Sequence, residues 1–233
     1  MARATVPGSG VALLTVTSKM PCDSWSLPAG RACPTAFVGD KADGYSWAAP
    51  DTTTICGHCY AKKGSYAWAA VENAQETRFR WTLDCQKAGD HGRESFVSIM
   101  VPAIRKSVAR QRTESKYFRV HDSGDLFSVW YVRAWMEICQ QLADVRFWIP
   151  TRAWRSKNPA LKAALLELAA LPNVALRPSA LFFNAPAPRV PGFAAGTTAS
   201  NAEFSCPAPG HNNACVDCRA CWDPSIEVSY RKH

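Results

Sequence analysis

The sequence indicates one α/β domain, built as a partial or distorted TIM-barrel-like (β/α) fold. Between residues 117 and 176, short apolar runs alternate three times with segments of helical period. This alternation is typical of a parallel sheet with right-handed crossovers. The 233 residues are 47% hydrophobic, which is enough to bury one full core. Two cysteine-rich segments without a sustained period, residues 21–64 and 204–224, are expected to be irregular parts of this single domain, 1–233.

The first half of the chain is expected to contain one strand and two helices. Residues 11–17 are apolar and rich in β-branched side chains, which predicts a buried first strand leading to Cys22. A helix is predicted from Tyr66 to Lys87, with Ser65 as its N-cap. A second helix is predicted over residues 94–110, and Pro102 is expected to kink it or to mark its start.

The second half carries the repeating units. A strand is predicted over Tyr117–Val120, followed by apolar residues at helical spacing from 127 to 142. Another strand over residues 146–149 precedes a helix with Asn158 as N-cap and Pro159 at its first position. Residues 174–176 begin a third unit. After Pro178 the periodicity fades, and the rest of the chain is predicted to be irregular.

Composition restricts the kind of protein. No apolar run approaches the roughly 20 residues that cross a bilayer, and the first twenty residues lack a signal-peptide pattern. We therefore expect a cytoplasmic protein without a membrane partner. The net charge of +8 agrees with phosphate-bearing partners and equally with ordinary solubility. Arg105–Lys116 is a basic stretch that predicts nucleic-acid contact or a solvated helix face.

Eight of the ten cysteines fall into two groups with the spacing of metal ligands, and in a reducing compartment such groups favour metal over disulfides. The tail group has three cysteines spaced by two residues and a remote Cys-Pro, an arrangement that resembles bacterial ferredoxins in reverse order. It predicts a [4Fe-4S] cluster, with tetrahedral zinc and a metal-free chain as alternatives. The tail group consists of Cys206, Cys215, Cys218 and Cys221.

The earlier group consists of Cys22, Cys33, Cys56 and Cys59. It predicts a second cluster, or further ligands for the tail site if the two chain ends meet. Cys22 has an alternative interpretation as a small buried residue. Cys85 and Cys139 lie within predicted helices, where packing explains them.

Polar residues follow three predicted strands. In parallel α/β folds the carboxyl ends of the strands face the binding cleft. His121, Asp122 and Asp125 are therefore candidate catalytic residues, although Asp125 could instead cap the next helix. Arg152 and Arg177 follow the next two strands, and they are candidates for binding an anionic cofactor, small molecule or nucleotide.

The sequence resembles a known phage family, gene product 88. The resemblance implies a phage origin, hence the host cytoplasm, and a shared cysteine-rich site. The residues that carry it are Cys56–Ala61, Gly64, Tyr66, His121–Asp125 and Cys218–Trp222.

The segment from Cys56 to Cys59 also resembles the radical S-adenosylmethionine enzymes. That resemblance implies a partial barrel, a three-cysteine cluster with one open iron, and S-adenosylmethionine as a possible cofactor. The spacing between Cys33 and Cys56 is longer than the compact motif of those enzymes. The sequence therefore predicts an iron-sulfur protein with redox or radical chemistry. The alternatives are a cluster-bearing nucleic-acid-binding or redox-sensing protein and a structural zinc protein.

Overall fold

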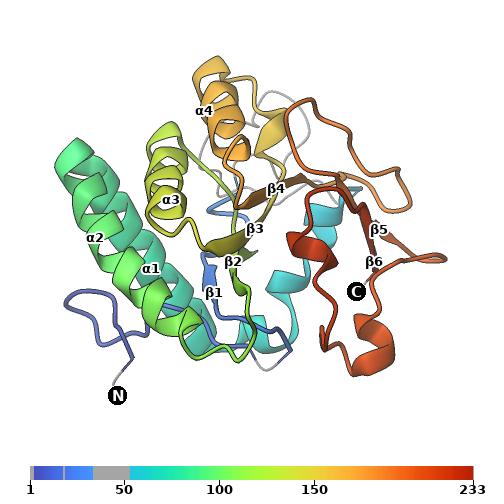
Figure 1. Ribbon diagram of the computed structural model, residues 1–233, viewed down its shortest axis with the longest axis horizontal. Helices are drawn as coiled ribbons and strands as arrows, with labels where there is room; N and C mark the ends of the chain where they lie inside the picture. Colours follow the sequence, from blue (N-terminus) through green and yellow to red (C-terminus); the bar gives the residue numbers. More distant parts are fainter. Residues whose placement is uncertain (1–2, 18, 34–52, 233) are drawn as a thin grey trace.

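A four-stranded parallel sheet forms the centre of the protein. The computed structural model describes residues 3–17, 19–33 and 53–232. Within them the strands lie in the order β1-β2-β3-β4, so that each neighbour follows in the sequence (Figure 1). The strands are β1 (Ser24–Ser26), β2 (Lys116–Ser123), β3 (Val145–Thr151) and β4 (Val174–Pro178).

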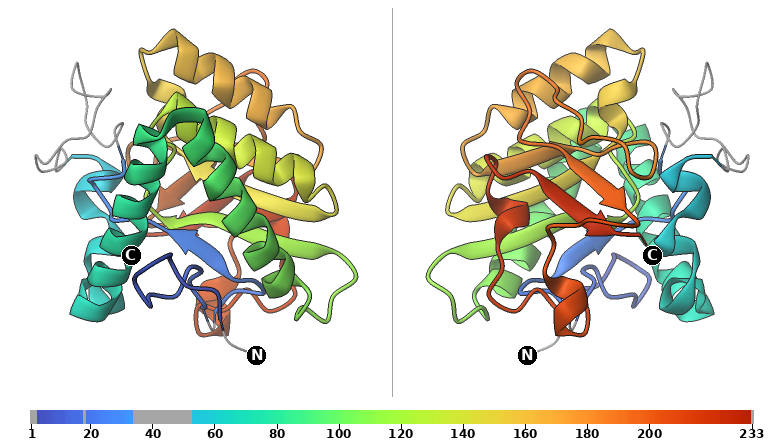
Figure 2. Two further views of the ribbon diagram at one scale, coloured as in Figure 1. Left: turned by 90° about the vertical axis from the view of Figure 1, so that its left-hand side faces the viewer. Right: turned by 90° about the vertical axis from the view of Figure 1, so that its right-hand side faces the viewer.

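Four helices cover one side of this sheet, and the C-terminal segment covers the other (Figures 1 and 2). The C-terminal segment includes a two-stranded parallel sheet of β5 (Thr197–Ser200) and β6 (Val228–Arg231). Both strands were missed by the sequence prediction, because each is only four residues long and neither has a clear alternation. The helices are α1 (Ala69–Lys87), α2 (Gly89–Val108), α3 (Val129–Gln141) and α4 (Pro159–Ala169).

The predicted parallel α/β arrangement is confirmed, but a TIM barrel is not formed. All three pairings in the larger sheet are parallel, as expected for strand-helix-strand units. The two sheets of the described chain are separate, and a parallel bridge of Ser179 with Thr197 links the end of β4 to the start of β5.

Aromatic side chains fill the layer between the sheet and the helices. Phe96 of α2 is fully buried and stacks on Trp81 of α1 at a centroid distance of 4.9 Å. It also meets Trp25 of β1 edge-on at 5.9 Å and Trp135 of α3 at 6.4 Å. Such edge and offset pairs add to the free energy that burial of the rings contributes. One continuous core therefore joins β1 to the first three helices.

The predicted first strand, residues 11–17, is wrong. This segment makes only isolated antiparallel bridges, including Thr15 with Ser24, and it folds back on itself through a hydrogen bond from Val6 N–H to the Val11 carbonyl. Leu13 is fully buried. The apolar pattern therefore reflects a buried loop, and it does not indicate a strand paired in a sheet. The first parallel strand is β1, which follows Cys22, whereas the predicted strand precedes Cys22.

The predicted helix limits differ from the observed ones. Trp68, and not Ser65, is the N-cap of α1, because residues Gly64–Ala67 form a separate 3-10 helix. The second helix begins at Gly89, and Pro102 lies inside it at an exposed position. Proline removes one backbone donor, and at an exposed position water can satisfy the carbonyl that this leaves free. Asn158 caps α4 with its side chain, as predicted.

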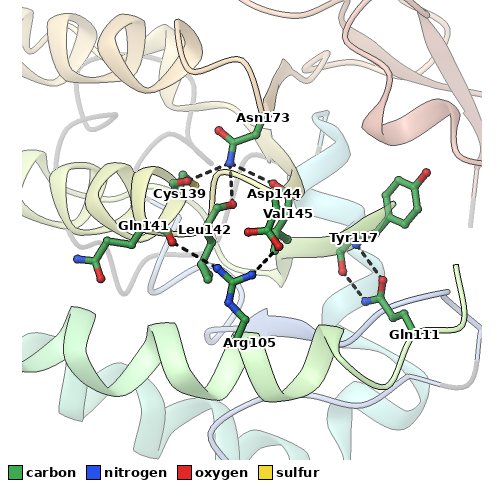
Figure 3. Close-up of polar contacts among 9 residues, drawn as sticks. All are labelled: Arg105, Gln111, Tyr117, Cys139, Gln141, Leu142, Asp144, Val145 and Asn173. Atoms are coloured by element: carbon green, nitrogen blue, oxygen red, sulfur yellow. Dashed lines mark hydrogen bonds and ion pairs between the residues drawn. The ribbon is translucent and has the colours of Figure 1, made fainter. Parts of the chain in front are cut away.

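Side chains also fix the amino ends of the strands, opposite the candidate site (Figure 3). Asn173 donates to the carbonyls of Cys139, Leu142 and Val145. Gln111 pairs with both backbone groups of Tyr117 at the start of β2. These hydrogen bonds stabilise the amino-terminal end of the sheet. In parallel α/β folds the functional site lies at the other end, where the strands finish.

The helices of the structure can be compared with the length and apolarity of a membrane span. Among the described residues, none of the helices combines the length and apolarity that a bilayer span requires.

Candidate functional site

A cavity of about 330 Å³ lies at the carboxyl ends of the sheet strands. This volume is within the range of sites for small molecules. It is bounded by the ends of β2 and β3, by the two 3-10 helices that follow residue 54, and by β5 and β6. Its lining includes three predicted metal ligands and four other predicted site residues: Cys33, Cys56, Cys59, His121, Asp122, Asp125 and Arg152.

Backbone hydrogen bonds bring Cys33 to this cavity. The amide of Asp125 donates to the carbonyl of Ala32 at 2.8 Å, which ties the Cys33 loop to the end of β2. Gly124, the residue before Asp125, has a φ of +92°. A Cβ at Gly124 would lie 2.7 Å from the Leu27 Cβ. Glycine is needed at this turn because other residues would be both strained and overlapping.

Cys56 and Cys59 are held by the end of β2 and by the segment after β4. They lie at a 3-10 helix of residues Ile55–His58, whose first amide donates to the Leu181 carbonyl at 2.7 Å. Tyr60 donates through its hydroxyl to the Asp122 carbonyl, and that hydroxyl accepts from Arg119 at 3.0 Å. Tyr60 and Arg119 were not predicted as site residues, because nothing in their sequence positions reveals this contact.

The three thiols lie close enough to influence one another. Burial raises the pKa of the Cys33 thiol, and the neighbouring Asp125, Cys56 and Cys59 raise it further. Burial also raises the pKa of Cys59, with Cys56 acting in the same direction. A cation placed among these thiols would reverse the effect, because coordination favours the thiolate.

The imidazole of His121 is neutral and buried, and one of its ring nitrogens forms a hydrogen bond with Tyr131. The indole of Trp25 donates to the Tyr131 hydroxyl at 2.7 Å, and that hydroxyl lies 2.9 Å from His121 Nε2. Since an indole only donates, the hydroxyl hydrogen is available to Nε2, and the neutral ring then carries its proton on Nδ1. Burial, with the positive charge of Arg119, lowers the pKa of His121 to about 3.

The end of β2 presents polar atoms without partners. His121 Nδ1 and Ser123 Oγ are buried and form no hydrogen bond within the described structure. Burial raises the pKa of Asp122, and hydrogen bonds with Ser24 and Ser26 act against that rise. His121 has a φ of +69° in the left-handed region, where a residue with a branched or bulky side chain is strained. Unpaired buried polar groups carry a desolvation cost unless a ligand or water meets them. The imidazole of His121 and the carboxyl group of Asp122 both border the cavity.

We expect stability to depend on His121 at low pH. Its unfolded pKa of about 6.5 exceeds its folded pKa of about 3, so the unfolded state takes up the proton first and stability is lost as pH falls from 6.5 toward 3. At pH 5 the loss amounts to about 2 kcal/mol. A His121→Asn variant, which tolerates the left-handed backbone, should lack this loss. Urea unfolding of both proteins at pH 7.5 and pH 5 measures it, and equal losses in the two proteins would contradict the assignment.

Asp125 joins two strand ends. Its carboxylate accepts from the Thr151 hydroxyl at 2.6 Å and from the backbone amides of Arg152 and Leu126 at 2.8 and 2.7 Å. Ser128, and not Asp125, caps α3. Burial raises the pKa of Asp125, and these three donors act against that rise. Its acceptors are therefore largely used in positioning the cavity wall.

The two arginines proposed for anion binding lie in different places. Arg152 lines the cavity, and its Nε donates to the Ala180 carbonyl at 2.9 Å. Arg177 is fully buried and is not among the residues that line the cavity. Its guanidinium instead donates to carbonyls of the C-terminal segment. The described lining also includes three cations that the sequence prediction missed: Arg119, Arg231 and Lys232.

The tail cysteines form a separate group, and Cys22 lies with them. Burial raises the pKa of Cys22, and Cys215 contributes in the same direction. Burial, followed by Cys206 and Cys218, raises the pKa of Cys215. Among the described residues, no three Cys, His, Asp or Glu side chains surround one point closely enough to hold a single metal ion.

The basic stretch is partly engaged within the molecule. Arg105 forms an ion pair with Asp144 at 2.5 Å, and Arg110 forms one with Asp23 at 2.6 Å. Lys116 donates to two backbone carbonyls, those of Gln111 and Thr113. Contact between this stretch and nucleic acid stays a prediction.

Comparison with known proteins identifies the family. The family model described as gene product 88 matches residues 3–224, which include every residue discussed above except those of β6 and Lys232. The chain belongs to the gene product 88 family. The resemblance predicted from the cysteine and His-Asp motifs is thereby confirmed.

Two curated relatives are phage proteins. The chain is 34% identical over 110 residues to the Gene 88 protein of Mycobacterium phage L5, and 32% identical over 110 residues to that of Mycobacterium phage D29. Each alignment covers 47% of this chain and 44% of the relative, so it spans less than half the length of either. No solved structure matches the chain. The comparisons support a bacteriophage family and give no reaction.

Proposed function

We propose that this gene product 88 protein is an iron-sulfur protein. Cys33, Cys56 and Cys59 would bind a [4Fe-4S] cluster, and the adjoining cavity would bind a small molecule that takes part in redox or radical chemistry. The observation that carries the proposal is that three thiols, a buried imidazole and a buried carboxyl group all line one cavity.

The donor set fits such a cluster. Thiolate is the usual ligand of iron in these clusters, and three thiolates leave one iron corner without a protein ligand. A single zinc ion requires four donors about 2.3 Å from one point, so its ligands must lie close together. A cubane cluster binds each thiolate at a separate iron and accepts thiols that are farther apart. When bound, the cluster would supply one-electron transfer at the cavity.

The remaining residues would bind and orient the small molecule. His121 and Asp122 line the cavity, so their imidazole and carboxyl groups would contact the polar groups of a ligand bound there. Arg152 and Lys232 supply positive charge for an anionic group on that ligand. S-adenosylmethionine, which has both amino and carboxylate groups, is one candidate that the resemblance to radical enzymes suggests.

Anaerobic purification with iron and sulfide quantification tests the cluster. The wild-type protein should be brown and should contain iron and acid-labile sulfide, and the C33S/C56S/C59S variant should lose about four iron atoms and four sulfides per chain. A C85A variant is the matched control, because Cys85 lies in α1 outside both cysteine groups and should leave the content unchanged. Zinc without iron or sulfide, or full iron content in the triple variant, would refute the proposal.

The chemistry has a test of its own. Incubation of the loaded protein with dithionite and S-adenosylmethionine should yield the cleaved adenosyl product, and an Asp122→Asn variant should yield less because it loses the negative charge of the carboxylate. A protein that holds the cluster without forming this product would retain the iron-sulfur assignment and exclude this one cofactor. A salt-sensitive DNA gel shift that is lost with the cluster would instead support the nucleic-acid-binding alternative.

A further inference from the structure

We infer that Cys22, Cys206, Cys215 and Cys218 bind a second iron-sulfur cluster, which exchanges electrons with the cavity site. The inference goes beyond the proposed function because it concerns a different group of thiols, on the face of the sheet that the C-terminal segment covers. Only its electron-exchange part rests on the cavity cluster.

Four thiols from two distant parts of the chain gather around Cys215. The amide of Cys215 donates to the Lys19 carbonyl at 2.9 Å, which ties the tail to the segment that carries Cys22. Cys218 returns to the same place through a turn closed by its amide and the Cys215 carbonyl at 2.8 Å. Cys206 packs against the small buried cluster that contains Cys22.

Cys221 lies at the edge of this group and has another partner. Its Sγ lies 3.3 Å from the Tyr230 hydroxyl. Because this contact engages the sulfur of Cys221, and no hydrogen bond between Cys22 and another side chain is found among the described residues, we assign the fourth ligand to Cys22.

Positive charge surrounds the tail thiols, as an anionic cluster requires. The guanidinium of Arg177 is fully buried and donates to the Cys221 carbonyl at 2.8 Å and to the Ala220 carbonyl at 2.7 Å. Arg119 donates to the sulfur of Met20 at 3.2 Å, two residues before Cys22. A buried cation is costly unless an opposite charge or several acceptors compensate it, and a cluster with four thiolates carries about two negative charges.

Aromatic side chains separate the two thiol groups by one layer. Trp148 and Tyr230 both line the cavity, and both also pack in the buried cluster that contains Cys22 and Cys221. Their rings are stacked with centroids 6.5 Å apart. Cys206, Cys215 and Cys218 are partly exposed, as are Cys33, Cys56 and Cys59 at the cavity. An external electron donor can therefore reach the tail centre, and the aromatic layer lies between that centre and the cavity.

The electron transfer balances with an external one-electron donor. A soluble electron-carrier protein would reduce the tail cluster by one electron. The tail cluster would pass that electron to the cavity cluster and return to its oxidised state, ready for the next donor. Dithionite can replace the carrier protein in a test.

Iron content distinguishes the second centre from the first. The wild-type protein, loaded anaerobically with iron and sulfide, should contain about eight iron atoms per chain, and C206S/C215S/C218S and C33S/C56S/C59S should each contain about four. Iron content in the tail variant equal to that of the wild type would overturn the second centre. About four iron atoms in the wild type, all kept by the cavity variant and lost by the tail variant, would refute the proposed function and leave this inference standing. The wild-type count does not depend on whether either variant folds.

Single variants test the ligand assignment, and spectroscopy tests the electron exchange. C22S should lose about half of the iron and C221S should keep it; the opposite result would overturn the choice of Cys22. The electron paramagnetic resonance spectrum of the dithionite-reduced wild type should be broader than the sum of the two triple-variant spectra, because nearby reduced clusters couple magnetically. A spectrum equal to that sum would overturn the electron exchange.

Discussion

Replacing Arg177 by leucine is expected to destabilise the protein by at least about 4 kcal/mol and to release the C-terminal segment from the sheet. The side chain donates to the carbonyls of Cys221, Ala195, Ile226, Ala220 and Asp223. Leucine cannot donate, so several of these carbonyls would lose their partner, and each buried unsatisfied group costs about 1–3 kcal/mol. Urea unfolding, followed by tryptophan fluorescence, measures the loss.

A second measurement locates the damage. Trypsin should cut the Arg177→Leu variant faster between residues 204 and 232 than it cuts the wild type, because the tail would no longer be held. Arg133→Leu is the matched control, since Arg133 is exposed on α3 and its replacement should change stability by less than about 0.5 kcal/mol. Equal stability of the two variants would contradict the structural role of Arg177.

Gly92→Ala is expected to cost about 3 kcal/mol or more. Gly92 lies in the first turn of α2 and is buried against the end of α1. A Cβ at this position would lie 1.8 Å from the carbonyl oxygen of Cys85, so the two helices would have to separate. Alanine normally favours a helix over glycine by about 1 kcal/mol, so a loss here would reverse the usual sign.

Gly210→Ala is the control for this effect. A Cβ at Gly210 would meet nothing within 4 Å. Its thermal midpoint should stay close to that of the wild type, whereas that of Gly92→Ala should fall by several degrees. A Gly92→Ala protein as stable as the wild type would show that α1 and α2 are packed less closely than described.

The sequence located the thiols but misjudged how they group. Cys56 and Cys59 were recognisable because their two-residue spacing is a local pattern. Cys22 was placed with them because it is near in sequence, yet it lies with Cys215, almost two hundred residues later. Pairing of this kind depends on contacts between chain ends, which spacing does not encode. The same reason explains why Tyr60, Arg119 and Lys232 were not foreseen at the cavity.

The repeating strand-helix part of the fold could be predicted from local sequence patterns. Apolar runs of short length, helical periods and the cap at Asn158 are properties of neighbouring residues, and they gave the order β2-α3-β3-α4-β4 correctly. The family was likewise recognisable from short motifs. Packing decided where the sheet ends, which way the C-terminal segment runs and what Arg177 binds. These features depend on hydrogen bonds to carbonyls that are distant in the sequence, and such bonds produce no periodic pattern of residues.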